Sequence, residues 1–370
     1  MNKLWEYKKI GDVCIVERGS SPRPIDKFIT NDKNGINWIK IGHTSDSMYI
    51  TETAQKIVPE GMRKSRYVKP GDFLLSNSMS FGHPYILKID GCIHDGWLLL
   101  RDEEGIFDKR FLYYYLSSKT TYEKLKSMAV GGVVNNLNSE MVRKMQVPVL
   151  SKKKQSEIAD LLDKLKKVLN ERKKEIQYLD ELIKARFVEM FGTYPANEKG
   201  WNTGNIRDIV SEVRYGSSRP AVDGGRYPYL RMNNITYDGE LDLSDTKRID
   251  VPDNELEKCT VRRGDVLFNR TNSKELVGKT CVYNRDEMMV LAGFVIRVRV
   301  NDEVLPEFLS AFLNTDFSKK MLLGMCKTAI GQANINAQEL QNICLYVPPI
   351  DLQQQFIDFK KQLDKSKVVA

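Results

Sequence analysis

Apolar residues recur at alternating steps of four and three along residues 151–191, a segment without glycine or proline. Such spacing is typical of a coiled-coil helix, and at about 1.5 Å per residue it predicts a rod of roughly 60 Å. The apolar seam consists of Ile158, Leu162, Leu165, Leu169, Ile176, Leu179 and Ile183, with Arg172 and Arg186 as polar positions. The seam needs a partner helix from this chain, from a second copy or from another protein.

Shorter apolar runs rich in β-branched and aromatic residues, bounded by Gly, Asn or Asp, indicate strands. Strands are predicted at residues 73–75, 86–89, 266–268 and 290–300. Amphipathic helices are predicted at residues 108–129 and 305–325, the second with Pro306 near its first turn. The order of these elements indicates mixed α/β domains with a strand-rich middle and a helical end.

Four segments of the first half recur in the same order in the second half, which indicates a duplication. The pairs are residues 10–24 with 206–220, 35–42 with 227–234, 68–78 with 261–271, and 131–150 with 331–350. We therefore predict an α/β (α+β) fold in which two repeated domains are separated by long coiled-coil-forming helices, with pseudo-twofold symmetry.

The expected domains are 1–148 and 193–349, with a long spacer helix at 149–192 and the start of a second spacer helix at 350–370. In this alignment Gln355 of the second helix corresponds to Gln155 of the first. The second helix is expected to be short by nature, truncated, or completed by another chain.

Charge and composition narrow the function only modestly. The chain of 370 residues has a formal net charge of +8, and the excess of Lys and Arg lies in residues 1–192. This permits nucleic-acid binding without demonstrating it, because surface solubility explains the same balance. The six cysteines form no C-x-x-C pair, and neither a signal peptide nor an apolar run of about 18 residues occurs, so we expect a cytoplasmic protein with reduced thiols.

Catalytic motifs are incomplete. The three histidines are scattered, and residues 273–280 (SKELVGKT) resemble a P-loop that lacks its first glycine. Residues 347–350 (VPPI) resemble part of the N-P-P-Y loop of adenine methyltransferases, but the leading Asn and the aromatic residue are missing. We interpret this segment as a proline stop between a strand and a helix. The sequence predicts no catalytic residues and no metal site.

Loops at matched positions of the two copies carry side chains able to contact DNA bases and phosphates. In the first copy these are Arg18, Ser20, Ser21, Arg23, Lys40, His43, Thr44, Ser76, Asn77, Ser78 and Asn136, with Ser80 and Asn135 beside them. In the second copy they are Arg214, Tyr215, Ser217, Ser218, Arg219, Arg231, Asn233, Asn234, Asn269, Arg270, Thr271, Asn272, Gln332 and Asn334. For any single residue, an ordinary turn made by Ser, Asn or Gly is the competing interpretation.

The order of these motifs resembles the specificity subunit of type I restriction-modification systems. The matching features are a G-[ST]-x-P-like loop, the W-I-K step at 38–40, a P-G-D strand entry with Gly71-Asp72, Asn136-Leu137-Asn138, and V-P-x-L/I before a helix with Gln155. Two positions depart from the family pattern: Gly42-His43 stands where an acidic residue is common, and Lys154 where Glu is usual.

The resemblance implies a non-enzymatic subunit with two target-recognition domains, each reading one half of an interrupted sequence in double-stranded DNA. Its helices would set the spacer length and dock two methyltransferase subunits, and restriction/translocase subunits would join for cleavage. S-adenosylmethionine would bind the methyltransferase, so no cofactor is expected on this chain. A protein-binding scaffold with duplicated domains is the main alternative, and an enzyme with an unfamiliar site is a third.

Overall fold

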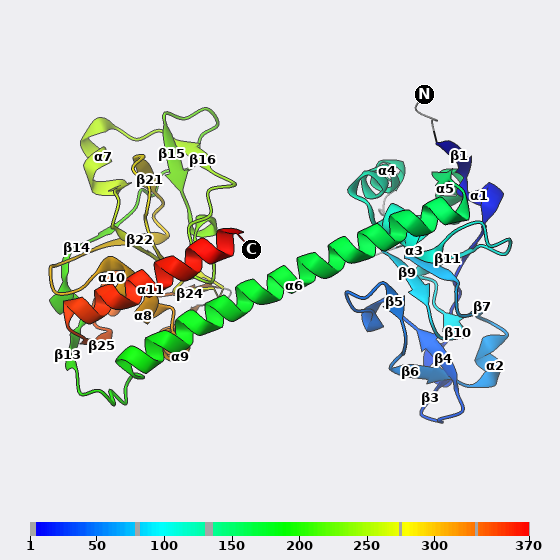
Figure 1. Ribbon diagram of the computed structural model, residues 1–370, viewed down its shortest axis with the longest axis horizontal. Helices are drawn as coiled ribbons and strands as arrows, with labels where there is room; N and C mark the ends of the chain where they lie inside the picture. Colours follow the sequence, from blue (N-terminus) through cyan, green and yellow to red (C-terminus); the bar gives the residue numbers. More distant parts are fainter. Residues whose placement is uncertain (1–4, 78–81, 130–135, 274–275, 330–331, 370) are drawn as a thin grey trace. The chain divides into compact units, whose positions relative to one another are not determined.

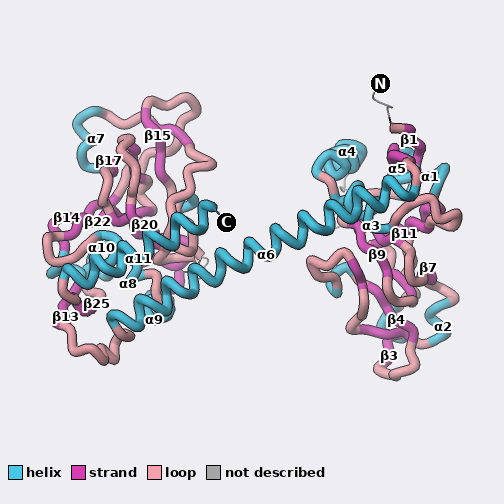
Figure 2. Tube along the Cα trace, in the orientation of Figure 1, coloured by secondary structure: helices cyan, strands magenta, loops and turns pink. Residues whose placement is uncertain are grey.

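The computed structural model describes residues 5–77, 82–129, 136–273, 276–329 and 332–369. The chain forms two compact units, residues 1–170 and 171–370. Both contain strands and helices, as the sequence predicts (Figure 1, Figure 2). The long helix predicted at residues 151–191 is confirmed as α6, Lys152–Phe191, and the division between the units falls inside it.

Two five-stranded sheets and one β-ribbon form the first unit. The sheet orders are β2-β11-β8-β9-β5 and β3-β6-β4-β10-β7, and β1 pairs with β12. The strands are β1 Glu6–Lys9, β2 Ile15–Arg18, β3 Ile29–Thr30, β4 Ile36–Ile39, β5 Tyr49–Ile50, β6 Gln55–Ile57, β7 Arg66–Val68, β8 Phe73–Ser76, β9 Pro84–Leu87, β10 Gly91–Ile93, β11 Trp97–Arg101 and β12 Gln146–Val149. The helices are α1 Ile10–Val13, α2 Pro59–Met62, α3 Lys109–Ser117, α4 Lys119–Ala129 and α5 Ser139–Lys144.

The second unit repeats this pairing. Its sheets are β14-β22-β18-β20, β16-β15-β21-β17 and β19-β24-β23, and β13 pairs with β25. The strands are β13 Asn202–Asn205, β14 Val210–Tyr215, β15 Tyr227–Leu230, β16 Lys247–Ile249, β17 Thr260–Val261, β18 Val266–Asn269, β19 Thr271–Asn272, β20 Thr280–Val282, β21 Met289–Leu291, β22 Val295–Val300, β23 Lys327–Ala329, β24 Gln332–Asn334 and β25 Cys344–Val347. The helices are α7 Asp253–Cys259, α8 Pro306–Leu313, α9 Asp316–Met325, α10 Ala337–Gln341 and α11 Ile350–Val369.

The central strands are apolar on both faces because both faces are covered. In β11, Leu98 and Leu100 belong to the core that includes α3, whereas Trp97 and Leu99 pack toward the second sheet. This explains why the strand is a continuous apolar run instead of an alternating one. In β22 the same two-sided burial holds, except that Arg297 stands between Ile296 and Val298, opposite Leu267 of β18.

Each helix predicted at 108–129 and 305–325 is in fact two helices. The first is interrupted at Ser118, and the second at Asn314 and Thr315. Thr315 caps α9 by accepting a hydrogen bond from the backbone N–H of Ser318. Ser and Thr compete with the helical hydrogen-bond pattern in this way, so apolar spacing alone overestimates helix length. The strand predicted at 290–300 is likewise two strands, β21 and β22, joined by a turn.

Within the second unit, α11 runs antiparallel to the C-terminal part of α6, as Figures 1 and 2 show. The Phe356 ring lies 5.3 Å from that of Phe187 and 5.7 Å from that of Phe191. Further along α11, Lys367 Nζ lies 2.6 Å from Asp180 Oδ1. The seam residue Ile183 is buried in this contact. Helix α11 is therefore the partner helix that this chain supplies for the end of the seam.

The rest of the predicted seam is covered less. Ile158 packs against the core of the first unit, and Leu162, Ile176 and Leu179 are half-buried. Leu165 and Leu169, in contrast, are 51% and 61% exposed. The middle of the seam thus has no intramolecular cover in the part of the chain that the structure describes.

A buried glutamine anchors each long helix and corrects the sequence alignment. The Gln155 amide donates to Leu150 O and Ile106 O and accepts from the Asp108 N–H. Gln353 makes the same three contacts in the second unit, donating to Pro348 O and Glu303 O and accepting from the Leu305 N–H. The equivalent of Gln155 is therefore Gln353, whereas Gln355 is exposed.

Replacing Gln353 by leucine should lower the free energy of unfolding by about 2 kcal/mol, because the backbone groups that it pairs would be buried unsatisfied. The matched change Gln355→Leu, at an exposed site, should stay within about 0.5 kcal/mol of the wild type. Urea unfolding of the full chain measures both. If both substitutions lowered the free energy of unfolding equally, the alignment of Gln155 with Gln353 would lose its support.

The described residues lack two features that would bear on function. They contain no helix of the length and apolarity that crossing a bilayer requires. They also contain no group of three or more His, Cys, Asp or Glu side chains placed to hold a metal ion.

Candidate nucleic-acid interface

The G-S-S loops of the two copies are held in the same way. Gly19 N–H donates to Trp97 O at 2.9 Å, and Gly216 N–H donates to Val295 O at 3.3 Å. The backbone N–H of the next residue donates to the last residue of β10 or β21: Ser20 N–H to Ile93 O, and Ser217 N–H to Leu291 O. The two loops therefore leave equivalent strands at an equivalent place.

Glycine is required in both loops by the close approach of the neighbouring backbone. A Cβ at Gly19 would lie 2.1 Å from His94 O, and one at Gly216 would lie 2.2 Å from Leu291 O. Real Cβ atoms do not approach backbone oxygens so closely, so any larger residue would displace the loop. The repeated glycine of the sequence thus has a physical cause in each copy.

In the first unit, the predicted loop residues converge on Asp95. Ser21 Oγ donates to Asp95 Oδ1 at 2.8 Å, and Arg23 Nη2 lies 3.6 Å from Asp95 Oδ2. Arg18 Nε and Asn77 Nδ2 both donate to the backbone oxygen of Asp95. The hydrogen bond from Ser21 is the largest cause that lowers the pKa of Asp95, so this carboxylate is charged at neutral pH. Nothing in the sequence singles out Asp95, because Ser21, which it contacts, lies 74 residues away.

A cavity of about 530 Å³ lies beside this cluster. Ser21, Arg23 and Lys40, three of the predicted residues, line it together with Trp38 and Gln55. Lys40 Nζ donates to Gln55 Oε1 at 3.2 Å, and the Arg23 side chain is 84% exposed. The fold thus brings two of the predicted loops of the first unit to one polar, solvent-accessible site.

In the second unit, acidic partners hold most of the predicted arginines. Arg219 Nη2 lies 2.8 Å from Glu255 Oε1, and Arg231 Nη2 lies 3.0 Å from Asp245 Oδ2. The hydrogen bond from Arg219 lowers the pKa of Glu255. These surface pairs orient the guanidinium groups, although each contributes little to the stability of the fold. A phosphate or a base edge could replace either carboxylate.

Tyr215 and Arg270 form a further pair at the end of β14, and Arg214 precedes Tyr215 in that strand. The Arg270 guanidinium lies 4.8 Å above the Tyr215 ring, and Tyr215 Oη accepts the N–H of Ala337 at 2.8 Å. Arg214 Nε donates to Glu212 Oε1 at 2.8 Å. The aromatic ring thus positions one cation, and a carboxylate positions the other.

Several predicted contact residues are instead buried and hold the loops from inside. Buried polar side chains of this set are Ser76, Asn77, Ser217, Asn234, Asn269 and Thr271. Asn234, for example, accepts from the Arg231 N–H and donates to Asp242 O and Asp245 O. The sequence analysis gave these six as residues able to contact DNA, and in this structure their side chains are buried. A buried asparagine and an exposed one have the same identity in the sequence, so only the fold distinguishes them.

The remaining predicted residues are placed as follows. Ser218, Asn233 and Asn136 are exposed, whereas Ser20, Thr44, Asn272 and Asn334 are half-buried. Thr44 Oγ1 donates to Ile41 O, Ser20 Oγ to Lys64 O, and Asn334 Oδ1 accepts from Thr271. Ser78, Ser80 and Asn135, and the side chains of His43 and Gln332, lie outside what the structure describes.

A known protein family matches both copies of the duplication. The model of a family described as "Type I restriction modification DNA specificity domain" matches residues 2–178 and again residues 198–368. The chain is 24% identical over 281 residues to the EcoKI specificity subunit of Escherichia coli K12, covering 72% of this chain and 60% of that protein. It is 25% identical over 268 residues to the MjaIX specificity subunit of Methanocaldococcus jannaschii, covering 66% and 61%. The matches thus span about three fifths of the length of these two relatives.

Two solved structures share the fold. One is described as showing complex assembly and conformational transition of the type I R-M system, with a TM-score of 0.60 at 16% identity, covering 100% of this chain and 92% of that one. The other is the S subunit of a type I system from M. genitalium, with a TM-score of 0.50 at 15% identity, covering 99% and 91%. Because the family model covers both units, each with its own G-S-S loop, the chain belongs to the type I restriction-modification DNA specificity domain family.

Proposed function

We propose that this chain is the DNA sequence-specificity subunit of a type I restriction-modification complex and has no catalytic role of its own. Each unit would read one half of a bipartite target in double-stranded DNA. The observation that carries the proposal is the pair of G-S-S loops, which are fixed by equivalent backbone hydrogen bonds and each followed by an exposed arginine, Arg23 or Arg219. Arginine suits both guanine edges and phosphates because its guanidinium group donates two parallel hydrogen bonds.

Differences between the two loop surroundings support different half-site sequences. In the first unit, Lys40 and Gln55 accompany the loop arginine at the cavity. In the second unit, the residues that follow β15 are Arg231 and the exposed Asn233. A lysine–glutamine surface and an arginine–asparagine surface present different donors and acceptors, so identical half-sites are not expected.

The exposed part of α6 supports a docking role for this helix. Leu161, Leu165, Val168 and Leu169 are 60%, 51%, 52% and 61% exposed. A stripe of this kind is more apolar than an isolated surface helix requires. In our proposal it receives two methyltransferase subunits, restriction/translocase subunits join them for cleavage, and the helices set the length of the unread spacer.

Methylation mapping tests the proposal. Cells with and without the gene are compared by long-read detection of methylated adenine, and an interrupted two-part motif should disappear when the gene is removed. Exchanging residues 1–148 for those of another family member should alter one half of the motif only. A protein-binding scaffold predicts no motif, and changes in both halves would contradict the modular assignment. Binding of the assembled complex to the mapped DNA should also weaken steeply with salt, since phosphate contacts release counterions.

Asp95 provides a sharper test of the first unit. Replacing Asp95 by asparagine should reduce the preference for the correct first half-site about tenfold, which corresponds to about 1.4 kcal/mol. The physical reason is that Ser21 and Arg23 lose the charge that orients them. Competition binding of the assembled complex, with each half of the mapped target altered in turn, measures this preference.

The matched control is Asp46→Asn, an exposed aspartate that should leave both preferences unchanged. Preference for the second half-site should also survive in the Asp95 variant. Equal loss for both halves would mean that Asp95 supports stability alone.

A further inference from the structure

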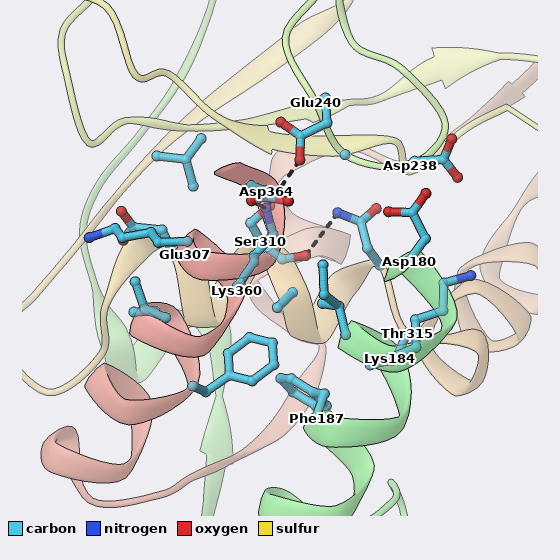
Figure 3. A pocket seen from close by; sticks show the side chains of 18 of the residues that line it. Asp180, Lys184, Phe187, Asp238, Glu240, Glu307, Ser310, Thr315, Lys360 and Asp364 are labelled. Atoms are coloured by element: carbon cyan, nitrogen blue, oxygen red, sulfur yellow. Dashed lines mark hydrogen bonds and ion pairs between the residues drawn. The ribbon is translucent and has the colours of Figure 1, made fainter. Parts of the chain in front are cut away.

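A cavity of about 500 Å³ that is open to solvent lies in the second unit, and none of the candidate DNA-contacting residues lines it. Its walls come from α6, from the loop at residues 237–240, from the α8–α9 region and from α11 (Figure 3). Cavities that bind small molecules typically measure about 300–1,000 Å³. The size therefore suits a ligand of roughly nucleotide dimensions.

One wall of the cavity is apolar and partly aromatic. Ile183 and Phe187 of α6 and Phe356 and Ile357 of α11 contribute to it, with Ala311 of α8. The Phe187 and Phe356 rings meet edge to face, which fixes their orientation. Figure 3 shows Phe187 on one side of the cavity and Glu240 on the opposite side. Phe187 and Phe356 are themselves 1% and 0% exposed, so they support this wall from within the core, whereas Ala311 is partly exposed.

Most charged groups around the cavity neutralise one another. Lys360 Nζ lies 3.1 Å from Glu240 Oε1 and 2.7 Å from Asp364 Oδ2. Lys367 Nζ lies 2.6 Å from Asp180 Oδ1 and 2.9 Å from Asp364 Oδ1. This chain of ion pairs joins α6, α11 and the loop at 237–240. Its members hold the wall in place and are already partnered.

Lys319 is different. Its half-buried ammonium donates to Gly278 O at 2.8 Å and lies 5.5 Å from the centre of the Tyr237 ring. No carboxylate among the described residues lies within 4.0 Å of it. Burial, followed by the charges of Lys184 and Lys279, lowers the pKa of Lys319 to about 8. Asp238, on the same lining, raises this pKa but forms no ion pair with Lys319, so the Lys319 ammonium has no directly paired carboxylate.

Asn314 supplies a second unmatched group on the cavity lining. Its Nδ2 donates to Thr280 O at 2.7 Å and to Ser310 O at 2.9 Å. Its Oδ1 is buried and has no hydrogen-bond partner among the described residues. Buried amide oxygens are normally satisfied, so this atom indicates a missing donor.

We propose that the cavity binds a small aromatic anion that carries an N–H donor on its ring, a class to which adenine mononucleotides belong. The ring lies on the apolar side of the cavity beside Ala311, the anionic group pairs with Lys319, and the ring amine donates to Asn314 Oδ1. This site is independent of DNA recognition, because it uses none of the loop residues.

Calorimetric titration of the full chain with AMP tests the proposal. AMP should bind, whereas adenosine, which lacks the anion, and inorganic phosphate, which lacks the ring, should each bind at least about tenfold more weakly. Purine riboside 5′-monophosphate, which lacks the ring amine, should also bind more weakly than AMP. Equal affinity of adenosine and AMP, or no binding of any probe at about 1 mM, would overturn the proposal.

Two substitutions locate the site. Lys319→Gln should weaken AMP binding about tenfold, whereas the matched change at the exposed neighbour, Lys320→Gln, should leave it unchanged. Ala311→Leu adds volume at the cavity lining and keeps Lys319, so it should weaken AMP binding by a separate route. Urea unfolding checks that each variant is folded. Wild-type affinity in both Lys319→Gln and Ala311→Leu would place AMP elsewhere and reject the assignment.

Discussion

Replacing Glu212 by alanine should lower the free energy of unfolding by about 3 kcal/mol, because it leaves a buried arginine without its counter-charge. Arg297 is only 1% exposed, and its Nη2 lies 3.1 Å from Glu212 Oε2. Arg299 Nη1 lies 2.6 Å from the same oxygen but keeps Asp265 as a second partner. The loss therefore falls chiefly on Arg297.

The first unit suggests how to test this explanation. Arg297 pairs across the sheet with Leu267 of β18, as Leu99 pairs with Leu74 of β8 in the first unit. The double variant Glu212→Ala with Arg297→Leu should recover much of the stability, since buried ion pairs can be replaced by apolar residues. Glu257→Ala, at an exposed site, is the matched control. Urea unfolding measures all three, and a Glu212→Ala value within about 0.5 kcal/mol of wild type would exclude the proposed role.

The ion pair of Glu212 with Arg297 also predicts that the stability of the fold depends on pH. Burial opposes ionisation of Glu212, but the hydrogen bond from Arg214 and the charges of Arg297 and Arg299 outweigh it and lower the pKa of the carboxyl group. A carboxylate with a lowered pKa stabilises the fold above its unfolded pKa, and this contribution is lost as the pH falls through the folded pKa. The stability difference between wild type and Glu212→Ala should therefore shrink as the pH is lowered from about 7 toward about 3. A constant difference would contradict this account.

Replacing Gly216 by alanine should abolish most recognition of one half-site. The new Cβ would lie 2.2 Å from Leu291 O and 2.4 Å from Ala292 O, so the loop must leave the end of β21. Displacement breaks the 2.6 Å hydrogen bond from Ser217 N–H to Leu291 O and moves Arg219 with it. Overpacking of this kind typically costs about 1–3 kcal/mol, and a loss of about 2.8 kcal/mol in half-site preference corresponds to about 100-fold.

Gly324→Ala is the control for the glycine change itself. Gly324 lies in α9, its added Cβ meets no atom within 4 Å, and alanine favours a helix. Competition binding on the mapped target should show normal selectivity for this control and loss for Gly216→Ala. Normal selectivity in the Gly216 variant would remove the loop from the DNA-reading surface.

Much of the architecture could be predicted because it depends on local pattern. The absence of glycine and proline and the heptad spacing were enough to predict α6 within one residue of its start. The repeated segments were enough to predict two copies of one fold, which the strand pairing confirms. One kind of error came where a side chain bonds to a nearby backbone group, as Thr315 does with the Ser318 N–H in dividing a predicted helix. Another came where two helices are aligned by spacing alone, as with Gln355 in place of Gln353.

The candidate site was less predictable. Loop position identified Ser21 and Arg23, but their common partner Asp95 lies more than 70 residues away in sequence. Asn234 and Asn269 are of a residue type that often contacts DNA bases, yet the fold buries both side chains. No single-sequence signal distinguishes these cases, because burial is decided by which segments pack together.

The sequence by itself determined the duplication, the long helix and the family, since hydrophobic spacing and the order of motifs are properties of the chain. Only the tertiary structure decided which polar residues remain exposed, which acidic groups hold the arginines, and that Lys319 and Asn314 line one cavity. The physical reason is that hydrophobic periodicity acts between near neighbours. Ion pairs, buried amides and cavities instead depend on contacts between distant segments, and these exist only once the chain has folded.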